Sequence, residues 1–159
     1  MDFGCGLGFI IKILAKKYPK KYFYGWDISN YIINANKKQK FNNLIFSVKD
    51  LNKISSNKKF DLVICLSSLH YFEDPINKIK ELLELLNDKG SLIFNYPNKE
   101  LLKEIKKDKN KIDYWKNRFK LMFNEKNLIS LNDIKNLGYT FKIIRESKKS
   151  NKYIQIIKS

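Results

Sequence analysis

The chain has 159 residues, of which 43% are hydrophobic and 14% aromatic. This length and apolar content predict one domain, residues 1–159, built around a single core. No apolar run approaches the roughly 18 to 20 residues that cross a bilayer, and the sequence opens on glycines instead of a secretion signal. We therefore expect a cytoplasmic protein without a membrane span.

The formal net charge is +16, which points toward an anionic partner such as nucleic acid. Of the 32 basic residues, however, only Arg118 and Arg145 are arginines, and the lysines are spread along the whole chain. A nucleic-acid surface concentrates its charge on one face. We favour solvated lysine faces and keep an RNA-directed function as an alternative.

Two cysteines, Cys5 and Cys65, fall in a predicted loop and a predicted buried strand. They lack the spacing of metal ligands and have no other thiols beside them. We interpret both as reduced packing residues, and we predict no metal site.

Helical and strand patterns alternate along the chain, which predicts a mostly parallel α/β sheet. After the glycine-rich segment, the expected helices are 9–18, 29–40, 75–86, one from about 99, and 131–137. The expected strands are 22–27, 44–48, 60–66, 91–96, 139–144 and 153–157, with 87–90 ending the helix before 91. The last two strands, joined by a polar turn, predict an antiparallel hairpin.

Gly4, Gly6 and Gly8 lie where a strand passes into a helix, so each can serve a tight turn or let a ligand approach the backbone. A dinucleotide-binding loop needs Gly-x-Gly-x-x-Gly, but here Phe9 occupies the last glycine's position. By itself the pattern fits either a ligand loop or a structural turn.

Two aspartates follow the next two strands. Asp27 stands 19 positions beyond Gly8, where a carboxylate can accept hydrogen bonds from the two hydroxyls of a ribose. The alternative role is a helix cap, for which Ser29 is also available. Asp50 suits an adenine amino group, with Leu51 supplying a backbone contact, and the alternative is a solvated loop aspartate.

Four segments together resemble the Rossmann-like class I S-adenosylmethionine-dependent methyltransferases, and most of all their small-molecule type 11 and type 12 groups. They are Asp2-Phe3-Gly4-Cys5-Gly6-Leu7-Gly8, Trp26-Asp27-Ile28-Ser29, Lys49-Asp50-Leu51 and Phe60-Asp61-Leu62-Val63. Ser68 to Pro75 is similar to the loop after the family's fourth strand, and Asp88 to Ile93 to the turn before its fifth.

The resemblance implies a doubly wound, mostly parallel sheet with a C-terminal antiparallel hairpin, and S-adenosyl-L-methionine as cofactor. The glycine loop, through Asp2, Gly4, Cys5, Gly6 and Gly8, would hold the methionine part. Asp27 would bind the ribose, Ile28 the adenine face, and Asp50 with Leu51 the adenine edge. Ser67 would line the site of methyl transfer to a small-molecule oxygen, nitrogen or carbon.

Methyl transfer from a sulfonium depends chiefly on aligning the reactants and excluding water. If the acceptor must lose a proton, His70 is the one histidine that could serve as base. The alternative is a histidine that packs its loop. Residues 99–129, with the aromatic stretch Tyr114 to Phe123, could form a lid over the acceptor or a helix packed on the sheet.

The sequence departs from the family at its start, because only Met1 precedes Asp2 where members carry a full first strand and earlier helices. Three explanations remain open: a truncated gene, a short form completed by a protein partner, or a form that no longer catalyses. A non-catalytic or partner-completed subunit is therefore a further functional alternative. The segment 65–68, Cys-Leu-Ser-Ser, lacks the Asp/Asn-Pro-Pro-aromatic motif common in enzymes that methylate base amines.

Overall fold

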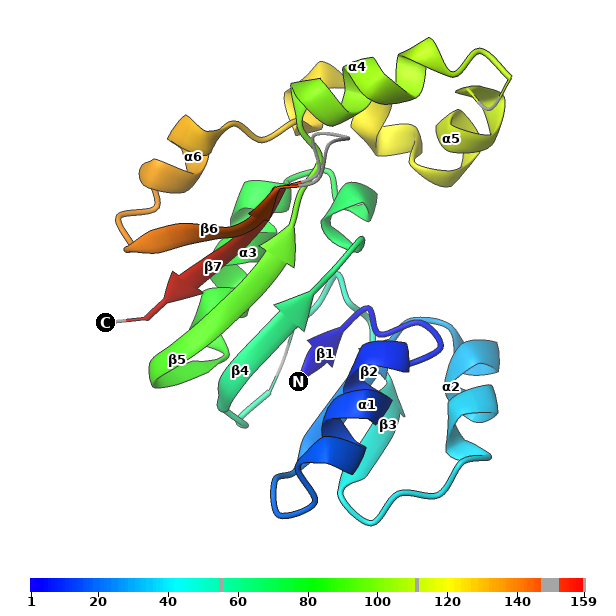
Figure 1. The fold of residues 1–159 in the computed structure, drawn as a ribbon, viewed down its shortest axis with the longest axis vertical. Coiled ribbons are helices and arrows are strands. Elements are labelled where there is room, and N and C mark those ends of the chain that lie inside the picture. The colour runs from blue at the N-terminus through cyan, green and yellow to red at the C-terminus, as the bar shows by residue number, and fades with distance from the viewer. Residues whose placement is uncertain (55, 111, 147–151, 159) are drawn as a thin grey trace.

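A computed structural model describes residues 1–54, 56–110, 112–146 and 152–158. Its centre is a seven-stranded sheet in the order β3-β2-β1-β4-β5-β7-β6 (Figure 1). The strands are β1 (Asp2–Phe3), β2 (Phe23–Asp27), β3 (Leu44–Val48), β4 (Phe60–Cys65), β5 (Leu86–Asn95), β6 (Phe141–Glu146) and β7 (Lys152–Ile157). The first five run parallel, whereas β7 is antiparallel to both β5 and β6. This is the Rossmann-like arrangement that the sequence predicts.

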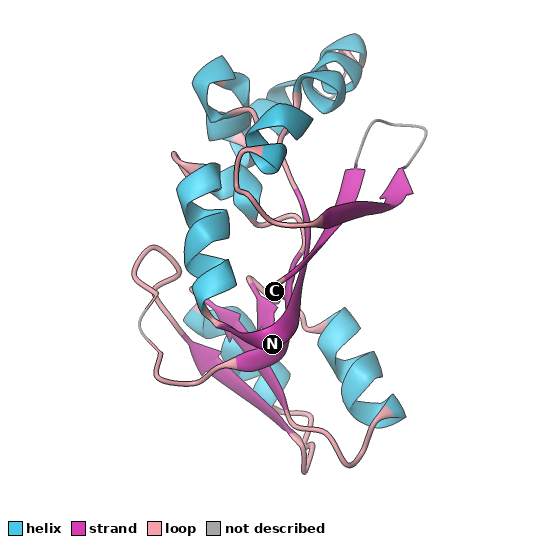
Figure 2. Cartoon of the chain, turned by 90° about the vertical axis from the view of Figure 1, so that its left-hand side faces the viewer, coloured by secondary structure: helices cyan, strands magenta, loops and turns pink. Residues whose placement is uncertain are grey.

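Helices cover both sides of this sheet, which Figure 2 shows nearly edge-on. Helix α1 lies on one face and α3 on the other (Figures 1 and 2). The α-helices are α1 (Phe9–Lys17), α2 (Asn30–Lys37), α3 (Pro75–Glu84), α4 (Lys99–Lys107), α5 (Ile112–Arg118) and α6 (Leu131–Lys135), and the 3₁₀ turns are η1 (Leu69–Tyr71), η2 (Lys120–Phe123) and η3 (Glu125–Asn127). The main core lies between the sheet and α3, where Val63, Leu82 and Leu92 are fully buried.

Strand β1 lies inside the sheet, between β2 and β4, although it has only two residues. Asp2 pairs with Gly25 on one side and with Ile64 on the other, and Phe3 pairs with Trp26. The chain order reverses here, because β2 and β3 follow to one side and β4 and β5 to the other. In open parallel sheets, ligands bind outside the carboxyl ends of the strands at such a switch point.

Most predicted elements agree with the structure to within a few residues, but the segment 87–90 does not. It was expected to end the helix, whereas α3 ends at Glu84 and β5 runs through 86–95. The backbone explains the difference: the Lys89 N–H donates to the carbonyl of Lys158 at 3.0 Å, and Gly90 accepts from the Lys158 N–H at 2.9 Å. Pairing with the end of the chain thus extends the strand. Of the predicted polar turn between 144 and 153, residues 147–151 lie outside the described residues, and the flanking residues belong to β6 and β7.

Candidate cofactor and acceptor site

The loops that follow β1, β2, β3 and β4 meet at one edge of the sheet and enclose a cavity of about 610 Å³. That volume lies within the range typical of small-molecule sites. The cavity is lined by Gly4, Cys5, Gly6, Leu7, Phe9, Asp27, Ile28, Ile32, Leu51, Asn52, Leu66, Ser67, Ser68, Tyr71, Phe72 and Arg118. Its walls are mostly apolar, and Asp27 and Arg118 carry the only charges among these lining residues.

The glycine loop turns sharply from β1 into α1. Its first two amides, Gly4 N–H and Cys5 N–H, both donate to the carbonyl of Trp26 at 2.9 Å. Gly4 has φ +70°, and a Cβ added there would lie 2.1 Å from Ser68 Oγ, so a larger residue requires Ser68 to shift. Gly6 has φ +51°, and a Cβ there would meet nothing within 4 Å. No side chain therefore covers Gly6, and a ligand can approach its Cα closely, while its N–H donates to Asp27 and its carbonyl accepts from Asn36 Nδ2 at 2.7 Å.

Asp27, the last residue of β2, links this loop to helix α2. The residue is 8% exposed, and its carboxylate accepts from the Gly6 N–H at 2.9 Å through Oδ2 and from the Ser29 N–H at 3.0 Å through Oδ1. The hydroxyl of Ser29, not Asp27, caps α2 by accepting from the Ile32 N–H at 3.3 Å. Each carboxylate oxygen can accept a second bond, so Asp27 keeps acceptor capacity in the cavity wall.

The loop after β3 contributes Leu51 and Asn52 to the cavity, whereas Asp50 does not line it. Asp50 instead accepts from the Asn52 N–H at 3.0 Å and shapes the turn. A buried lysine from α3 supports this turn from below. Lys78 Nζ donates to the carbonyls of Leu51 at 3.0 Å and Asn52 at 3.2 Å, and it pairs with Glu81. A charged donor thus holds the backbone that faces the cavity.

The end of β4 is bent by Ser67, which has φ +57°, a backbone conformation uncommon for residues with a side chain. Its N–H donates to Oδ1 of Asn95 at 2.6 Å. The next residue, Ser68, donates its hydroxyl to the carbonyls of Gly4 and Leu66, both at 3.3 Å. Strain of this kind concentrates at functional sites, and here it turns Ser67 into the cavity wall.

An aromatic cluster around Phe119 packs behind Tyr71, which lines the cavity. The Phe119 ring lies 5.4 Å from Tyr71 and 5.0 Å from His70, and it stacks on Trp115 at 5.6 Å and 11°. The segment α5–η2 therefore packs against η1, the turn that follows β4. Within the predicted lid of residues 99–129, this is the part that approaches the cavity.

His70 is buried beside that cluster but is not among the residues that line the cavity. It is 4% exposed, and within the described part of the chain its Nδ1 atom has no hydrogen-bond partner. Burial lowers the pKa of His70 from its ordinary 6.5 to about 4, because the charged imidazolium would lose its hydration. The ring is therefore neutral at physiological pH.

The structure brings seven of the ten predicted cofactor residues to one cavity: Gly4, Cys5, Gly6, Asp27, Ile28, Leu51 and Ser67. Asp2, Gly8 and Asp50 lie outside its lining. Asp2 is 5% exposed inside the sheet, where burial raises the pKa of its carboxyl to about 6. Gly8 packs against Phe46 and begins α1.

Sequence reasoning did not assign Asn52, Ser68, Lys78 or Arg118 to the site. Asn52 follows Leu51 and Ser68 follows Ser67, so the sequence could have indicated both through these predicted neighbours. Arg118 was visible as one of two arginines among 32 basic residues. Lys78 carries no signal in the sequence, because only the packing of α3 against the loop after β3 brings it there.

Both cysteines are free thiols. Cys5 lines the cavity, and burial raises the pKa of its thiol to about 12, so it stays protonated. Cys65 is fully buried at the end of β4, and burial likewise raises its thiol pKa. Among the described residues, no group of three or more His, Cys, Asp or Glu side chains is arranged to hold a metal ion.

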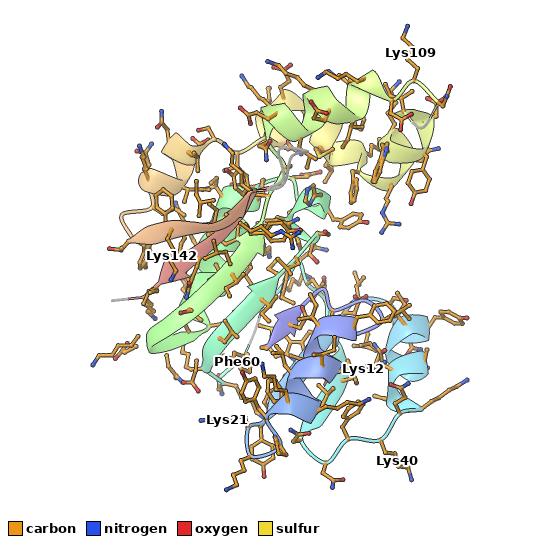
Figure 3. All side chains as sticks on the ribbon, viewed as in Figure 1. Lys12, Lys21, Lys40, Phe60, Lys109 and Lys142 are labelled. Atoms are coloured by element: carbon orange, nitrogen blue, oxygen red, sulfur yellow. The ribbon has the colours of Figure 1, made fainter. Side chains whose placement is uncertain are left out.

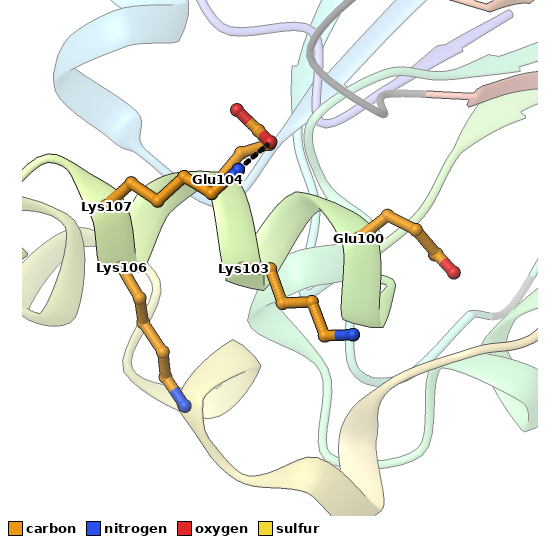
Figure 4. Close-up of a pocket in the computed structure, with 5 residues that line it drawn as sticks. All are labelled: Glu100, Lys103, Glu104, Lys106 and Lys107. Atoms are coloured by element: carbon orange, nitrogen blue, oxygen red, sulfur yellow. Dashed lines mark hydrogen bonds and ion pairs between the residues drawn. The ribbon is translucent and has the colours of Figure 1, made fainter.

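The lysines do not gather at the cavity. Figure 3 labels Lys12, Lys21, Lys40, Lys109 and Lys142, which lie on widely separated parts of the surface. A second hollow, of about 430 Å³, is lined by Glu100, Lys103, Glu104, Lys106 and Lys107 (Figure 4). All five residues belong to α4, and Lys107 Nζ pairs with Glu104 Oε1 at 2.9 Å along the helix. This second hollow is therefore part of a charged helix surface. None of the helices in the described ranges is long and apolar enough to span a bilayer.

Comparison with known proteins gives a consistent family assignment. A family model described as a methyltransferase domain matches residues 1–127. Among curated relatives, a malonyl-[acyl-carrier protein] O-methyltransferase of Priestia megaterium is 29% identical over 96 residues, covering 60% of this chain and 35% of that protein. Malonyl-[acyl-carrier protein] O-methyltransferase 2 of Ilyobacter polytropus is 28% identical over 138 residues, covering 85% of this chain and 51% of that protein. The chain thus spans about a third to a half of these relatives.

Solved structures share the fold. The plantazolicin methyltransferase BpumL, in complex with a triazolic desmethylPZN analog and SAH, superposes with a TM-score of 0.74 at 16% identity, over 99% of this chain and 75% of that one. Magnesium protoporphyrin IX methyltransferase (ChlM) from Synechocystis PCC 6803, with bound SAH, gives a TM-score of 0.71 at 23% identity, over 99% and 73%. With the family match over most of its length, the chain belongs to the methyltransferase domain family, and it has the Rossmann-like fold of these two structures.

Proposed function

We propose that this chain binds S-adenosylmethionine and transfers its methyl group to a small-molecule acceptor. The observation that carries the proposal is the junction of Gly6 and Asp27, where a glycine with open space at its Cα donates its N–H at 2.9 Å to a buried aspartate in the wall of the same cavity. The glycine loop suits the methionine part of the cofactor, and the carboxylate suits the ribose hydroxyls. The glycine loop and the Asp27 carboxylate therefore fit this cofactor.

The remaining assignments follow the order of residues along the cavity wall. Ile28 and Leu51 both line the cavity; Ile28 would offer an apolar surface to the adenine face, and the backbone of Leu51 would contact the adenine edge. Asp50 remains a proposed adenine contact, although it lies one residue outside the lining. Ser67, at the bent end of β4, would face the transferred methyl group.

When bound, S-adenosylmethionine supplies a methyl group that its sulfonium already activates for displacement. The chain's own task is then to hold the acceptor in line and to exclude water. The apolar lining, with Leu66, Tyr71 and Phe72 beside Ser67, serves the second purpose.

We further propose that the acceptor atom is a carboxylate oxygen. The cavity lining holds no histidine or lysine, and its single carboxylate, Asp27, already accepts from two backbone amides. An acceptor that is ionised at neutral pH needs no general base there. The carboxylate oxygen forms the new bond to the methyl carbon while the carbon–sulfur bond breaks and its electron pair stays on sulfur, so no proton moves. The relatives named malonyl-[acyl-carrier protein] O-methyltransferases support this choice.

Calorimetry with S-adenosylhomocysteine tests cofactor binding. We expect saturable binding with one site per chain, and a folded sample that shows no binding would contradict the proposal. Conversion of malonyl-N-acetylcysteamine to its methyl ester, followed by mass spectrometry with S-adenosylmethionine as donor, tests the acceptor assignment separately. Cofactor binding without ester formation would leave the first part intact and reject the second.

A further inference from the structure

Arg118 is the cationic residue of the cavity wall. It ends helix α5, and its side chain is held in place by two aromatic neighbours. Nη1 donates to the hydroxyl of Tyr114 at 3.4 Å, and the guanidinium carbon lies 5.5 Å from the centre of the Phe119 ring. Stacking on an aromatic face restrains the planar guanidinium and leaves most of its five N–H donors unused.

The charges around Arg118 leave it without an anionic partner. Within residues 112–146 and the other described ranges, no carboxylate forms an ion pair with it. Asp27, the other charged residue of the lining, sits at the end of β2 and is engaged with Gly6 and Ser29. A cation facing a mostly apolar cavity favours an anionic group on the molecule that enters it.

The position of Arg118 indicates which molecule carries that group. Phe119 contacts Tyr71, so the wall that bears Arg118 is packed on η1, directly after the Ser67–Ser68 bend. The proposed cofactor contacts, Asp27, Ile28 and Leu51, come from the loops after β2 and β3. Arg118 therefore belongs to the wall formed after β4, where the acceptor must meet the methyl group.

We infer that Arg118 binds the carboxylate of the methyl acceptor and selects acidic acceptors over neutral ones. The inference rests on the proposed function and names the residue that recognises its substrate class. A guanidinium can offer two parallel N–H donors to a carboxylate, which fixes the orientation of the acid. A methyl ester has no charge and loses this pairing, so the same residue favours release of the product.

The test uses malonyl-N-acetylcysteamine and its methyl ester as probes, with binding to the full chain measured by calorimetry with and without S-adenosylhomocysteine. Arg118 is exposed, so water screens the pairing, and we expect the wild-type chain to bind the acid up to about fivefold more tightly than the ester. Arg118→Gln should abolish this preference, and Arg118→Lys should retain part of it. Lys116→Gln removes a positive charge from the same helix outside the cavity and should keep the full preference.

Three results would overturn the inference. The first is an acid preference that survives in Arg118→Gln, and the second is the absence of this preference from the wild-type chain. The third is a loss of S-adenosylhomocysteine affinity in Arg118→Gln with unchanged affinity for 5′-methylthioadenosine, which has no carboxylate, because Arg118 would then hold the cofactor. Failure of the wild-type chain to bind S-adenosylhomocysteine is a different outcome and would reject the proposed function.

Discussion

The ammonium group of Lys78 lies 3.0 Å from the carbonyl oxygen of Leu51. Helix α3 therefore holds the loop after β3, which lines the cavity. Lys78 is 4% exposed, and its Nζ also reaches the carbonyl of Asn52. A buried lysine is uncommon unless its charge is compensated, and here two carbonyls and the carboxylate of Glu81 do so.

Replacing Lys78 with Met should loosen this loop and leave the two carbonyls unpaired. We expect a loss of about 2 kcal/mol in the free energy of unfolding and about tenfold in affinity for S-adenosylhomocysteine. Urea denaturation and calorimetry measure the two effects. Lys80→Met, an exposed position on the same helix, is the matched control and should change neither. Equal effects at both positions would show that the loop does not depend on Lys78.

Replacing Asp27 and Asp50 with Asn, one at a time, compares the proposed ribose contact with the proposed adenine contact. Asn keeps one acceptor oxygen but removes the charge that strengthens bonds to the Gly6 amide and to a ribose. We expect S-adenosylhomocysteine affinity to fall about tenfold or more. Asp50→Asn should have a smaller effect, since Asp50 lies outside the cavity lining. If calorimetry shows a larger loss for Asp50→Asn, the adenine edge depends on Asp50 more than the ribose does on Asp27.

Gly4→Ala should destabilise the fold more than a matched substitution at Gly138. Both glycines have positive φ, +70° and +79°, so both alanines incur the backbone penalty of about 1 kcal/mol. Only Gly4 faces an obstacle, because its new Cβ would lie 2.1 Å from Ser68 Oγ. Crowding of this kind costs about 1 to 3 kcal/mol more. Urea midpoints of the two variants would give the difference, and similar midpoints would mean that Ser68 can move away freely.

His70 should make the fold sensitive to mild acid. Its pKa in the folded chain is about 4, below its ordinary value of 6.5, so only the unfolded state takes up a proton between these two values. Stability from this group is complete above pH 6.5 and falls by about 3 kcal/mol as the pH drops to 4. Asp2, with a pKa raised to about 6 by burial, acts in the opposite direction over part of the range.

The His70 contribution is therefore read as the difference between the wild-type chain and His70→Phe, measured by urea denaturation at several pH values. The gap in unfolding free energy should shift in favour of the variant as the pH falls. His70→Phe also tests the predicted base, since general-base catalysis contributes about 10² to 10⁴ in rate. With a carboxylate acceptor, the variant should keep most of its methyl-transfer activity. A hundredfold loss would assign the base to His70.

The segment 87–90 shows where local pattern stops predicting the fold. Asn-Asp-Lys-Gly is typical of a helix end, and α3 does end at Glu84, three residues before Asn87. The backbone of Lys89 and Gly90, however, pairs with Lys158, which is distant in sequence. Such long-range pairing leaves no trace in a short window of sequence. The core strands were predictable because their apolar runs depend only on local burial.

The sequence by itself determined the alternation of helices and strands, the glycine loop and the acidic residue after β2, since these depend on backbone freedom and on periodic burial along the chain. The tertiary structure alone decided which residues share the cavity. It placed Asn52 in the lining instead of Asp50, buried His70 behind Phe119, and brought Lys78 and Arg118 to the site from α3 and α5. Those positions depend on how helices pack against loops distant in sequence, and that packing sets the charge and shape that a ligand meets.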